Sequence, residues 1–199
     1  MSLSKSERTR QHIIEKAAPF FNKKGYADTS MADIVAATGL TKGAIYGNFD
    51  NKDDLALQVF DHNFGLLKNG TQRFMDAKRD AVEKLLAMVD YYRQEYRQVA
   101  ARGGCPLLNA ATEADDNFPA LRNKVRQGIR GWKRSIVQVI EMGQAQKTIR
   151  MGVDANKYAT VFIALLEGGV MLAKAMDDPQ QLNESLDRID VMIRTELAV

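Results

Sequence analysis

The stretch TSMADIVAATGLTKGAIYGNFDNKDDL, residues 29–55, decides the fold, because it places two short helical patterns on either side of a turn that contains glycine. Ser30 followed by Asp33 matches the capping box that begins a helix. Gly39 occupies a position where a left-handed backbone conformation reverses the chain at little steric cost. Thr41 is then expected to cap a second short helix. The sequence therefore predicts a compact pair of helices joined by a tight turn.

The second helix of this pair is predicted to have one buried face. Ile45 and Phe49 are four residues apart and are expected to pack, together with Leu40, onto neighbouring helices. The residues left on the other faces are Lys42, Ala44, Tyr46 and Asn48. This helix is therefore expected to present a polar outer surface.

Helical spacing continues on both sides of this stretch, and no alternating strand pattern extends beyond a few residues, so we expect an all-α protein. A first helix is expected to end at Gly25, and Asn51 is expected to begin a long helix that reaches about residue 71. Further helices are predicted from about residue 78 to the sequence ARGGCPLLN, then over residues 107–114, 118–146, 158–176 and 182–197. We divide the chain into an N-terminal domain, residues 1–52, and a larger C-terminal domain, residues 53–199.

The net charge of +3 lies entirely in the N-terminal quarter of the chain. Residues 1–52 contain eight Lys and Arg against five Asp and Glu, whereas the remaining residues carry equal numbers of both signs. A local positive excess favours a polyanion as partner, although a solvated basic face explains the charge equally well.

The composition argues against several other classes of protein. The single cysteine, Cys105, cannot form an internal disulfide, and the sequence offers no cluster of metal ligands, so we expect neither a metal nor a cofactor. No apolar run approaches the roughly 18 to 20 residues that a membrane helix needs. The first ten residues lack the apolar segment of a signal peptide. We therefore expect a cytoplasmic protein with no membrane partner.

Two helices joined by a short turn with glycine match a helix-turn-helix, whose second helix enters the major groove of DNA by its N-terminal end. The pattern supplies a supporting helix, a turn that sets the crossing angle and an outward face that can donate hydrogen bonds. A helical corner inside a bundle would show the same pattern. The helical pattern alone leaves both interpretations open.

A family resemblance favours DNA binding. Residues 9–57 resemble the signature of the tetracycline-repressor (TetR) family of bacterial transcriptional regulators. The residues that carry the resemblance are Gly25, Tyr26, Ser30, Asp33, Ile34, Gly39, Lys42, Gly43, Ile45, Tyr46, Phe49, Lys52 and Asp53. The resemblance implies an N-terminal three-helix DNA-binding domain with a helix-turn-helix, and a larger helical C-terminal domain for ligand binding and dimerisation. It also implies a homodimeric repressor, not an enzyme, that a small-molecule effector releases from a palindromic double-stranded DNA operator.

The family's DNA-contacting positions can be matched to this sequence. Ser30, Tyr46 and Lys52 match phosphate-contacting positions. The surface of the recognition helix corresponds to Thr41, Lys42, Gly43, Ala44 and Asn48. A packing role for Tyr46 and a solvated position for Lys52 are the alternatives.

This sequence departs from the family pattern in the recognition helix. Ala44 and Gly47 stand where larger or polar side chains are frequent, and Asn48 replaces the usual histidine or tyrosine. We therefore expect readout of the DNA sequence to depend on Lys42, Asn48, DNA shape and a thymine contact by Ala44. A basic N-terminal arm is expected to add contacts through Lys5, Arg8 and Arg10.

The C-terminal domain offers candidate residues for an effector pocket. The aromatic and sulfur-containing side chains suited to line an apolar cavity are Tyr92, Tyr96, Trp132, Met142, Phe162 and Met171. The same side chains suit a plain hydrophobic core. Cys105 follows two glycines and is expected to border this site, where its thiol would sense electrophiles or oxidants, whereas an inert buried cysteine is the alternative.

The last two helices carry the predicted dimer interface. Its residues are Leu165, Gly168, Gly169, Leu182, Leu186, Ile189 and Ile193. Apolar residues recur at intervals of three and four along the terminal helix, and the glycine pair would permit close helix approach in a two-fold four-helix seam. An amphipathic terminal helix that packs on the core of its own chain would show the same spacing.

Two other classes of function fit parts of the sequence. A helical protein-interaction module would need no contact with DNA. A helical enzyme with Cys105 as nucleophile would need a base, but His12 and His62 both lie outside the segment of this cysteine. The sequence supplies no orienting partner for the thiol, which favours the regulator.

Overall fold

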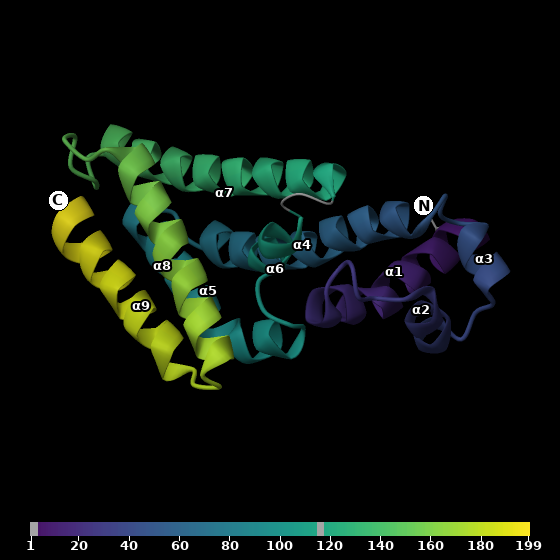
Figure 1. Ribbon diagram of the computed structural model, residues 1–199. Coiled ribbons are helices and arrows are strands. Elements are labelled where there is room, and N and C mark those ends of the chain that lie inside the picture. Colours follow the sequence, from purple (N-terminus) through teal and green to yellow (C-terminus); the bar gives the residue numbers. More distant parts are fainter. Residues whose placement is uncertain (1–3, 115–117) are drawn as a thin grey trace. The chain divides into compact units, whose positions relative to one another are not determined.

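The structure is a computed structural model that describes residues 4–114 and 118–199, and these residues are mostly helical (Figure 1). Its elements are α1 (Lys5–Lys24), α2 (Met31–Thr38), α3 (Lys42–Tyr46), α4 (Lys52–Asp76), α5 (Ala81–Ala101), α6 (Pro106–Glu113), α7 (Pro119–Ala145), α8 (Ala155–Ala175), α9 (Gln180–Val191) and a final π-type segment, η1 (Met192–Leu197). Within the described ranges, the extended structure is limited to an isolated bridge between Ile149 and Ala198. The expected all-α fold is confirmed.

The chain divides into two compact units. The first contains Met1–Leu66 and Arg102–Arg126, and the second contains Leu67–Ala101 and Gln127–Val199. The division runs through α4 and α7, so these helices contribute to both units. The functional boundary at residue 52 stays a prediction.

The first unit joins the N-terminal helices to the segment around α6 through buried amides. The Nδ2 atom of Asn22, near the end of α1, donates to the carbonyl oxygens of Arg102 and Gly104 at 2.7 and 3.2 Å. Asn109 of α6 donates in return to Oδ1 of Asn22 at 3.0 Å. One oxygen of Glu113 accepts from the backbone N–H of Tyr26 at 2.6 Å. Asn22 in α1 and Tyr26 just after it are therefore bonded to α6 and to the segment that precedes α6.

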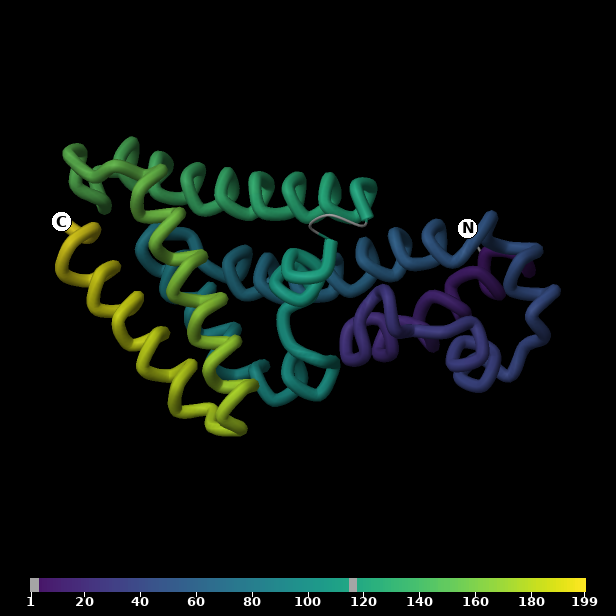
Figure 2. Tube along the Cα trace, in the orientation of Figure 1, coloured from purple at the N-terminus to yellow at the C-terminus, as the bar shows by residue number. Residues whose placement is uncertain are grey.

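The second unit is built around α8 and α9, which lie side by side (Figure 2). A Cβ added at Gly169 of α8 would lie 2.9 Å from Cβ of Ser185 on α9. The absence of a side chain at this glycine therefore lets the two helices approach each other within the chain. The residues of α9 that face α8 and α5 include Leu182, Leu186 and Ile189, which are buried.

Three details of the sequence interpretation differ from the structure. α4 continues to Asp76, about one turn beyond the expected end. Ile129 of α7 is spaced like the buried Val125 and Ile136, but its side chain is exposed. The terminal helix changes at Met192 to the wider π-type winding, and the backbone N–H of Arg150 donates to the carbonyl of Leu197 at 2.9 Å.

The apolar character of α8 also differs from expectation. Among the described residues, this helix alone is long and apolar enough to cross a membrane by length and composition, although only 33% of its most apolar window is buried in the chain. The sequence shows no uninterrupted apolar run here, because polar residues are scattered along α8. Its buried residues include Phe162, Leu166 and Val170, so one face of α8 belongs to the core of the second unit.

Candidate nucleic-acid interface

The turn between α2 and α3 has the capping contacts that the sequence predicts. Ser30 accepts from the backbone N–H of Asp33 at 3.1 Å, and the Asp33 carboxylate accepts from the backbone N–H of Ser30 at 2.9 Å. Gly39 ends α2 in the left-handed conformation, with φ of 68°. Thr41 begins α3, and its hydroxyl accepts from the N–H of Ala44 at 3.2 Å. The predicted capping of both short helices is therefore confirmed.

α3 presents most of its surface to solvent. Ile45 is 1% exposed and packs into the first unit together with Phe49, as expected. The predicted recognition residues on the other faces, Thr41, Lys42, Gly43 and Ala44, are exposed. Tyr46 is 42% exposed, which favours a surface role over the alternative of a packing aromatic. A short helix with one buried residue thus displays its remaining side chains.

Lys42 and Tyr46 lie next to each other on this surface. The Nζ atom of Lys42 is 5.8 Å from the centroid of the Tyr46 ring, within the range of a cation–π contact. The pair therefore combines one positive charge with one phenolic hydroxyl, both of which can donate to a phosphate oxygen or a base edge.

Asn48 has a different arrangement from the one expected. Its side chain turns back onto α3, and Nδ2 donates to the carbonyl oxygen of Ala44 at 2.8 Å. The amide group that was expected to read base edges therefore satisfies the C-terminal end of α3. Asn48 lies at the edge of the exposed surface and is only half-exposed.

The two other predicted phosphate-contacting residues also make contacts inside the protein. The Ser30 hydroxyl donates to Oδ2 of Asp33 at 2.8 Å. The Nζ atom of Lys52 donates to the carbonyl oxygen of Ala27 at 2.8 Å, across 25 residues of sequence. Lysine has three donors, so this bond leaves Lys52 able to meet a phosphate oxygen as well. Both residues border the loop between α1 and α2.

The Asp33 carboxylate carries an additional ion pair. Lys24, in the last turn of α1, approaches Oδ1 of Asp33 at 2.7 Å. The hydrogen bond from Lys24, followed by those from the backbone and side chain of Ser30, lowers the pKa of Asp33 to about 2. This ion pair connects the end of α1 to the start of α2.

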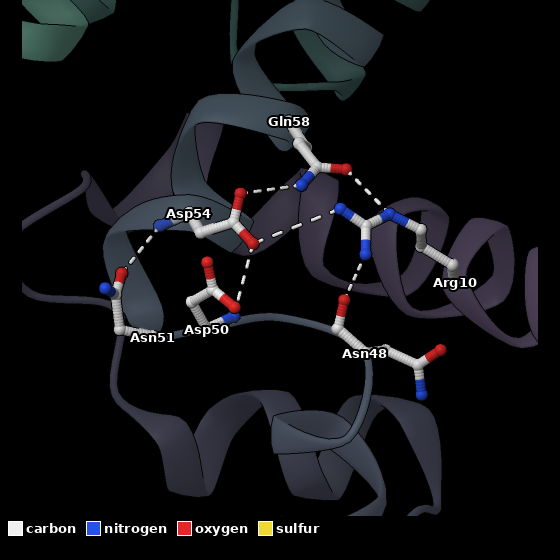
Figure 3. Close-up of polar contacts among 6 residues, drawn as sticks. All are labelled: Arg10, Asn48, Asp50, Asn51, Asp54 and Gln58. Carbon is white, nitrogen blue, oxygen red and sulfur yellow. Dashed lines mark hydrogen bonds and ion pairs between the residues drawn. The ribbon is translucent and has the colours of Figure 1, made fainter.

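The basic residues expected to form an N-terminal arm belong to α1, and their contacts with DNA stay a prediction. Ser4 caps α1 through a capping box with Glu7, so Lys5, Arg8 and Arg10 lie in the first turns of the helix. The guanidinium group of Arg10 contacts protein acceptors at the junction between α3 and α4 (Figure 3). The capping box of Ser4 and Glu7 is the sequence signal that places the start of the helix before these basic residues.

Comparison with known protein families agrees with this geometry. Residues 13–59 match the family described as "Bacterial regulatory proteins, tetR family", and residues 81–189 match "Tetracyclin repressor-like, C-terminal domain". The second match alone spans more than half of the chain. The chain belongs to the TetR family.

Individual TetR-family proteins resemble the chain along most of its length. A TetR-family transcriptional regulator from Cytophaga hutchinsonii has a crystal structure that superposes with a TM-score of 0.94 at 40% identity, covering 100% of this chain and 99% of that chain. The HTH-type transcriptional regulator TtgR of Pseudomonas putida is 44% identical over 82% of this chain and 79% of its own length. The HTH-type transcriptional repressor DhaR of a Mycobacterium species is 24% identical, covering 89% and 88%. The protein is a DNA-binding transcriptional regulator with an N-terminal helix-turn-helix domain.

The residues predicted for a TetR-type effector pocket have unequal environments. Tyr92, Tyr96 and Phe162 are buried in the second compact unit, and Trp132 and Met142 are half-buried there. Met171 is 51% exposed on α8, and its place in the pocket stays a prediction. Burial raises the pKa of the Tyr96 hydroxyl. The grouping of the remaining five as an effector pocket stays a prediction.

Cys105 belongs to the first compact unit and is 1% exposed. It occupies the N-cap position of α6, directly before Pro106. Because a reactive thiol must be reached by its reagent, this burial favours the alternative of an inert small residue over a sensor. A position next to the effector pocket stays a prediction.

The residues predicted for the TetR-type dimer interface separate into two groups. Leu182, Leu186, Ile189 and Ile193 are at most 1% exposed in the single chain. They belong to the core of their own unit, and their place in a dimer interface stays a prediction. The alternative interpretation, an amphipathic terminal helix on its own core, explains their spacing.

The two glycines of α8, Gly168 and Gly169, also differ in their surroundings. Gly169 faces Ser185 and Leu182 of the same chain, and its expected contact with a second chain stays a prediction. A Cβ at Gly168 would meet no atom within 4 Å. Gly168 and the half-buried Leu165 lie on the more open side of α8 and stay candidates.

Proposed function

We propose that the protein is a homodimeric repressor that binds a palindromic double-stranded DNA operator and leaves it when a small-molecule effector binds. The observation that carries this proposal is the exposed surface of α3, capped at Thr41 and anchored by Ile45. A helix that displays a cation, a phenol and open backbone at its N-terminal end suits docking into a major groove. A cytoplasmic location is part of the same proposal, since the operator is there.

The surface of α3 favours a limited direct readout. Lys42 and Tyr46 supply the donors, Ala44 offers an apolar contact to a thymine methyl, and Thr41 and Gly43 allow close approach of the backbone. Asn48 reads a base only if its amide leaves the carbonyl of Ala44. We therefore assign Ser30, Tyr46 and Lys52 to phosphate contacts, and Lys42 with Ala44 to base contacts.

The exposed face of α8 supports the proposed dimer. Leu165, Gly168, Leu172 and Met176 are separated by three or four residues, which places them along one side of the helix. Leu172 and Met176 are exposed in the single chain. A second copy related by a two-fold axis would cover this apolar stripe with its own α8. This arrangement replaces the interface that the terminal helix was expected to supply.

Release by an effector follows as a shift between two dimer populations. We expect the effector to bind the second unit. It lowers operator affinity if it favours a dimer in which the spacing of the two α3 helices no longer matches that of successive major grooves. A coupling free energy of about 1 to 3 kcal/mol gives a useful switch. The repressor name of the relative DhaR supports this direction of control.

The proposal is tested by selecting bound fragments from genomic DNA with the full-length protein. We expect recovered fragments to share an inverted repeat, with half-sites spaced by about one helical turn or a multiple of it. Titration of one fragment with salt should show a steep loss of affinity, as phosphate contacts require. Recovery of fragments with no common sequence would contradict the proposal, and absence of salt-dependent binding to any duplex would favour a helical protein-interaction module.

A further inference from the structure

Arg10 extends from α1 to the junction between α3 and α4 (Figure 3). Its Nε donates to Oε1 of Gln58 at 3.0 Å, and Nη1 donates to the backbone carbonyl oxygen of Asn48. Nη2 lies 4.0 Å from Oδ2 of Asp54. The guanidinium carbon is 4.5 Å from the centroid of the Phe49 ring. Each of the three guanidinium nitrogens therefore faces an acceptor of the protein itself.

These acceptors are connected to one another. Gln58 donates through Nε2 to Oδ1 of Asp54 at 2.8 Å. Oδ2 of Asp54 accepts from the backbone N–H of Asp50 at 3.3 Å, and the backbone N–H of Asp54 donates to Oδ1 of Asn51 at 2.8 Å. One carboxylate thus faces Arg10, the first turns of α4 and the loop that precedes α4. We call Arg10, Asp54 and Gln58 the junction cluster.

The junction cluster matters because α3 is too short to orient itself. α3 contains five residues, and an isolated helix of that length is not stable in water. Its orientation depends on Thr41 at one end, on the burial of Ile45, and on the backbone that leaves its other end at Asn48. The carbonyl of Asn48 is the group that Arg10 binds.

We propose that Arg10 is a positioning residue for DNA recognition: through the Asn48 carbonyl and Asp54, it fixes the end of α3 and so the angle at which α3 is presented. This inference rests on the proposed role of α3 as the DNA-contacting helix. An isolated, partly exposed ion pair contributes little. The junction cluster differs because one planar guanidinium makes three contacts with two segments, α4 and the loop that follows α3, and Lys cannot reproduce that geometry.

The competing explanation is that Arg10 contacts phosphate, as a basic residue near the N-terminus is expected to do. The two explanations predict opposite signs for Asp54→Asn. If only charge near DNA matters, removal of a carboxylate raises operator affinity. If Asp54 orients Arg10 and α3, the same change lowers operator affinity. Asp53→Asn is the matched control, because exposed Asp53 is adjacent and lies outside the junction cluster.

The experiment measures affinity of the full-length variants for a duplex recovered from the genomic selection, over a series of salt concentrations. We expect Arg10→Lys and Asp54→Asn each to weaken operator binding about tenfold or more, with a salt slope parallel to that of the original protein. Arg73→Lys, an exposed position in the last turn of α4, and Asp53→Asn should not weaken binding. The combined Arg10→Lys and Asp54→Asn variant should lose little more than either single variant, because both changes disrupt one network.

The opposite results overturn the inference. Arg10→Lys that binds as tightly as the original protein, or Asp54→Asn that binds more tightly, removes the positioning role. If Arg10→Gln lowers the slope of log affinity against log salt by about 2 per dimer, and Arg10→Lys keeps the original slope, then Arg10 contacts a DNA phosphate. Circular dichroism at the assay temperature identifies any unfolded variant, and Gln58→Ala then tests the same network. If the original protein itself binds no specific duplex, the proposed function fails, which is a different result from failure of the variants alone.

Discussion

Lys42 carries the positive charge of the exposed α3 surface and lies 5.8 Å from the Tyr46 ring centroid. The contact keeps the ammonium group near the phenol without burying it, so both donors stay available to DNA. The Asn48 amide is bonded to Ala44, which leaves Lys42 as the side chain on which the proposed readout depends most directly.

We expect Lys42→Ala to lower operator affinity by about tenfold or more, since a good contact to a base is worth about 1 to 3 kcal/mol. The slope of log affinity against log salt should become shallower by up to about 2 per dimer, if each lysine also displaces a counterion. Fluorescence anisotropy across a salt series measures both quantities. Lys16→Ala, an exposed change on α1, is the control, and an equal effect there would contradict a specific role for Lys42.

The Lys24–Asp33 ion pair gives stability a defined dependence on pH. The pKa of Asp33 is lowered from 3.8 to about 2, chiefly by the hydrogen bond from Lys24. Because the pKa of Asp33 is lower in the folded protein than in the unfolded chain, the ionised carboxylate stabilises the fold at pH values above the unfolded pKa. This stabilisation is lost as the pH falls from about 4 to about 2. Urea unfolding of the original protein and of Asp33→Asn should therefore give free energies that differ at pH 5 and converge toward pH 2. A difference that stays constant between pH 5 and pH 2 would contradict this assignment.

At the scale of elements, the sequence predicts most of what its local contacts determine. The caps at Ser30, Gly39 and Thr41 involve partners within four residues, so their patterns could be read directly. Arg10 could not be interpreted in this way, because its acceptors lie 38 and 48 residues away. Sequence periodicity finds the buried face of α9 but does not say whether the same chain or a second chain covers it.

Two glycines of α7 provide a matched test of packing between elements. A Cβ at Gly143 would lie 2.6 Å from Cδ1 of Ile149 and 2.8 Å from Cβ of Ala81, whereas a Cβ at Gly131 would meet nothing within 4 Å. We expect Gly143→Ala to destabilise the protein by about 1 to 3 kcal/mol through overpacking. Gly131→Ala should stabilise it by up to about 1 kcal/mol through helix propensity. Chemical denaturation measures both changes, and a stabilising Gly143→Ala would show that Ile149 moves aside at no cost.

At the scale of the whole molecule, burial separates the core of one chain from the surface between two. The terminal helix packs apolar residues into the core of its own unit, where Leu186 and Ile189 are fully buried. α8 has a buried face toward α9 and a second apolar face that the single chain leaves open. A two-fold dimer that brings two copies of α8 together would cover the second face, and it would make the spacing of the two α3 helices a property of the pair.

Leu172→Glu tests this assembly, because Leu172 is 40% exposed in the chain and lies on the open face of α8. A charge buried in a two-fold interface meets its own copy across the axis and loses hydration without gaining a partner. We expect light scattering after gel filtration to give the mass of a single chain for Leu172→Glu and twice that mass for the original protein. Operator affinity should fall with it, because a monomer binds only one half-site. Met151→Glu places the same charge on a residue that is 76% exposed outside α8 and should stay dimeric. Dimers of unchanged mass and affinity for Leu172→Glu would assign the open face of α8 to another role.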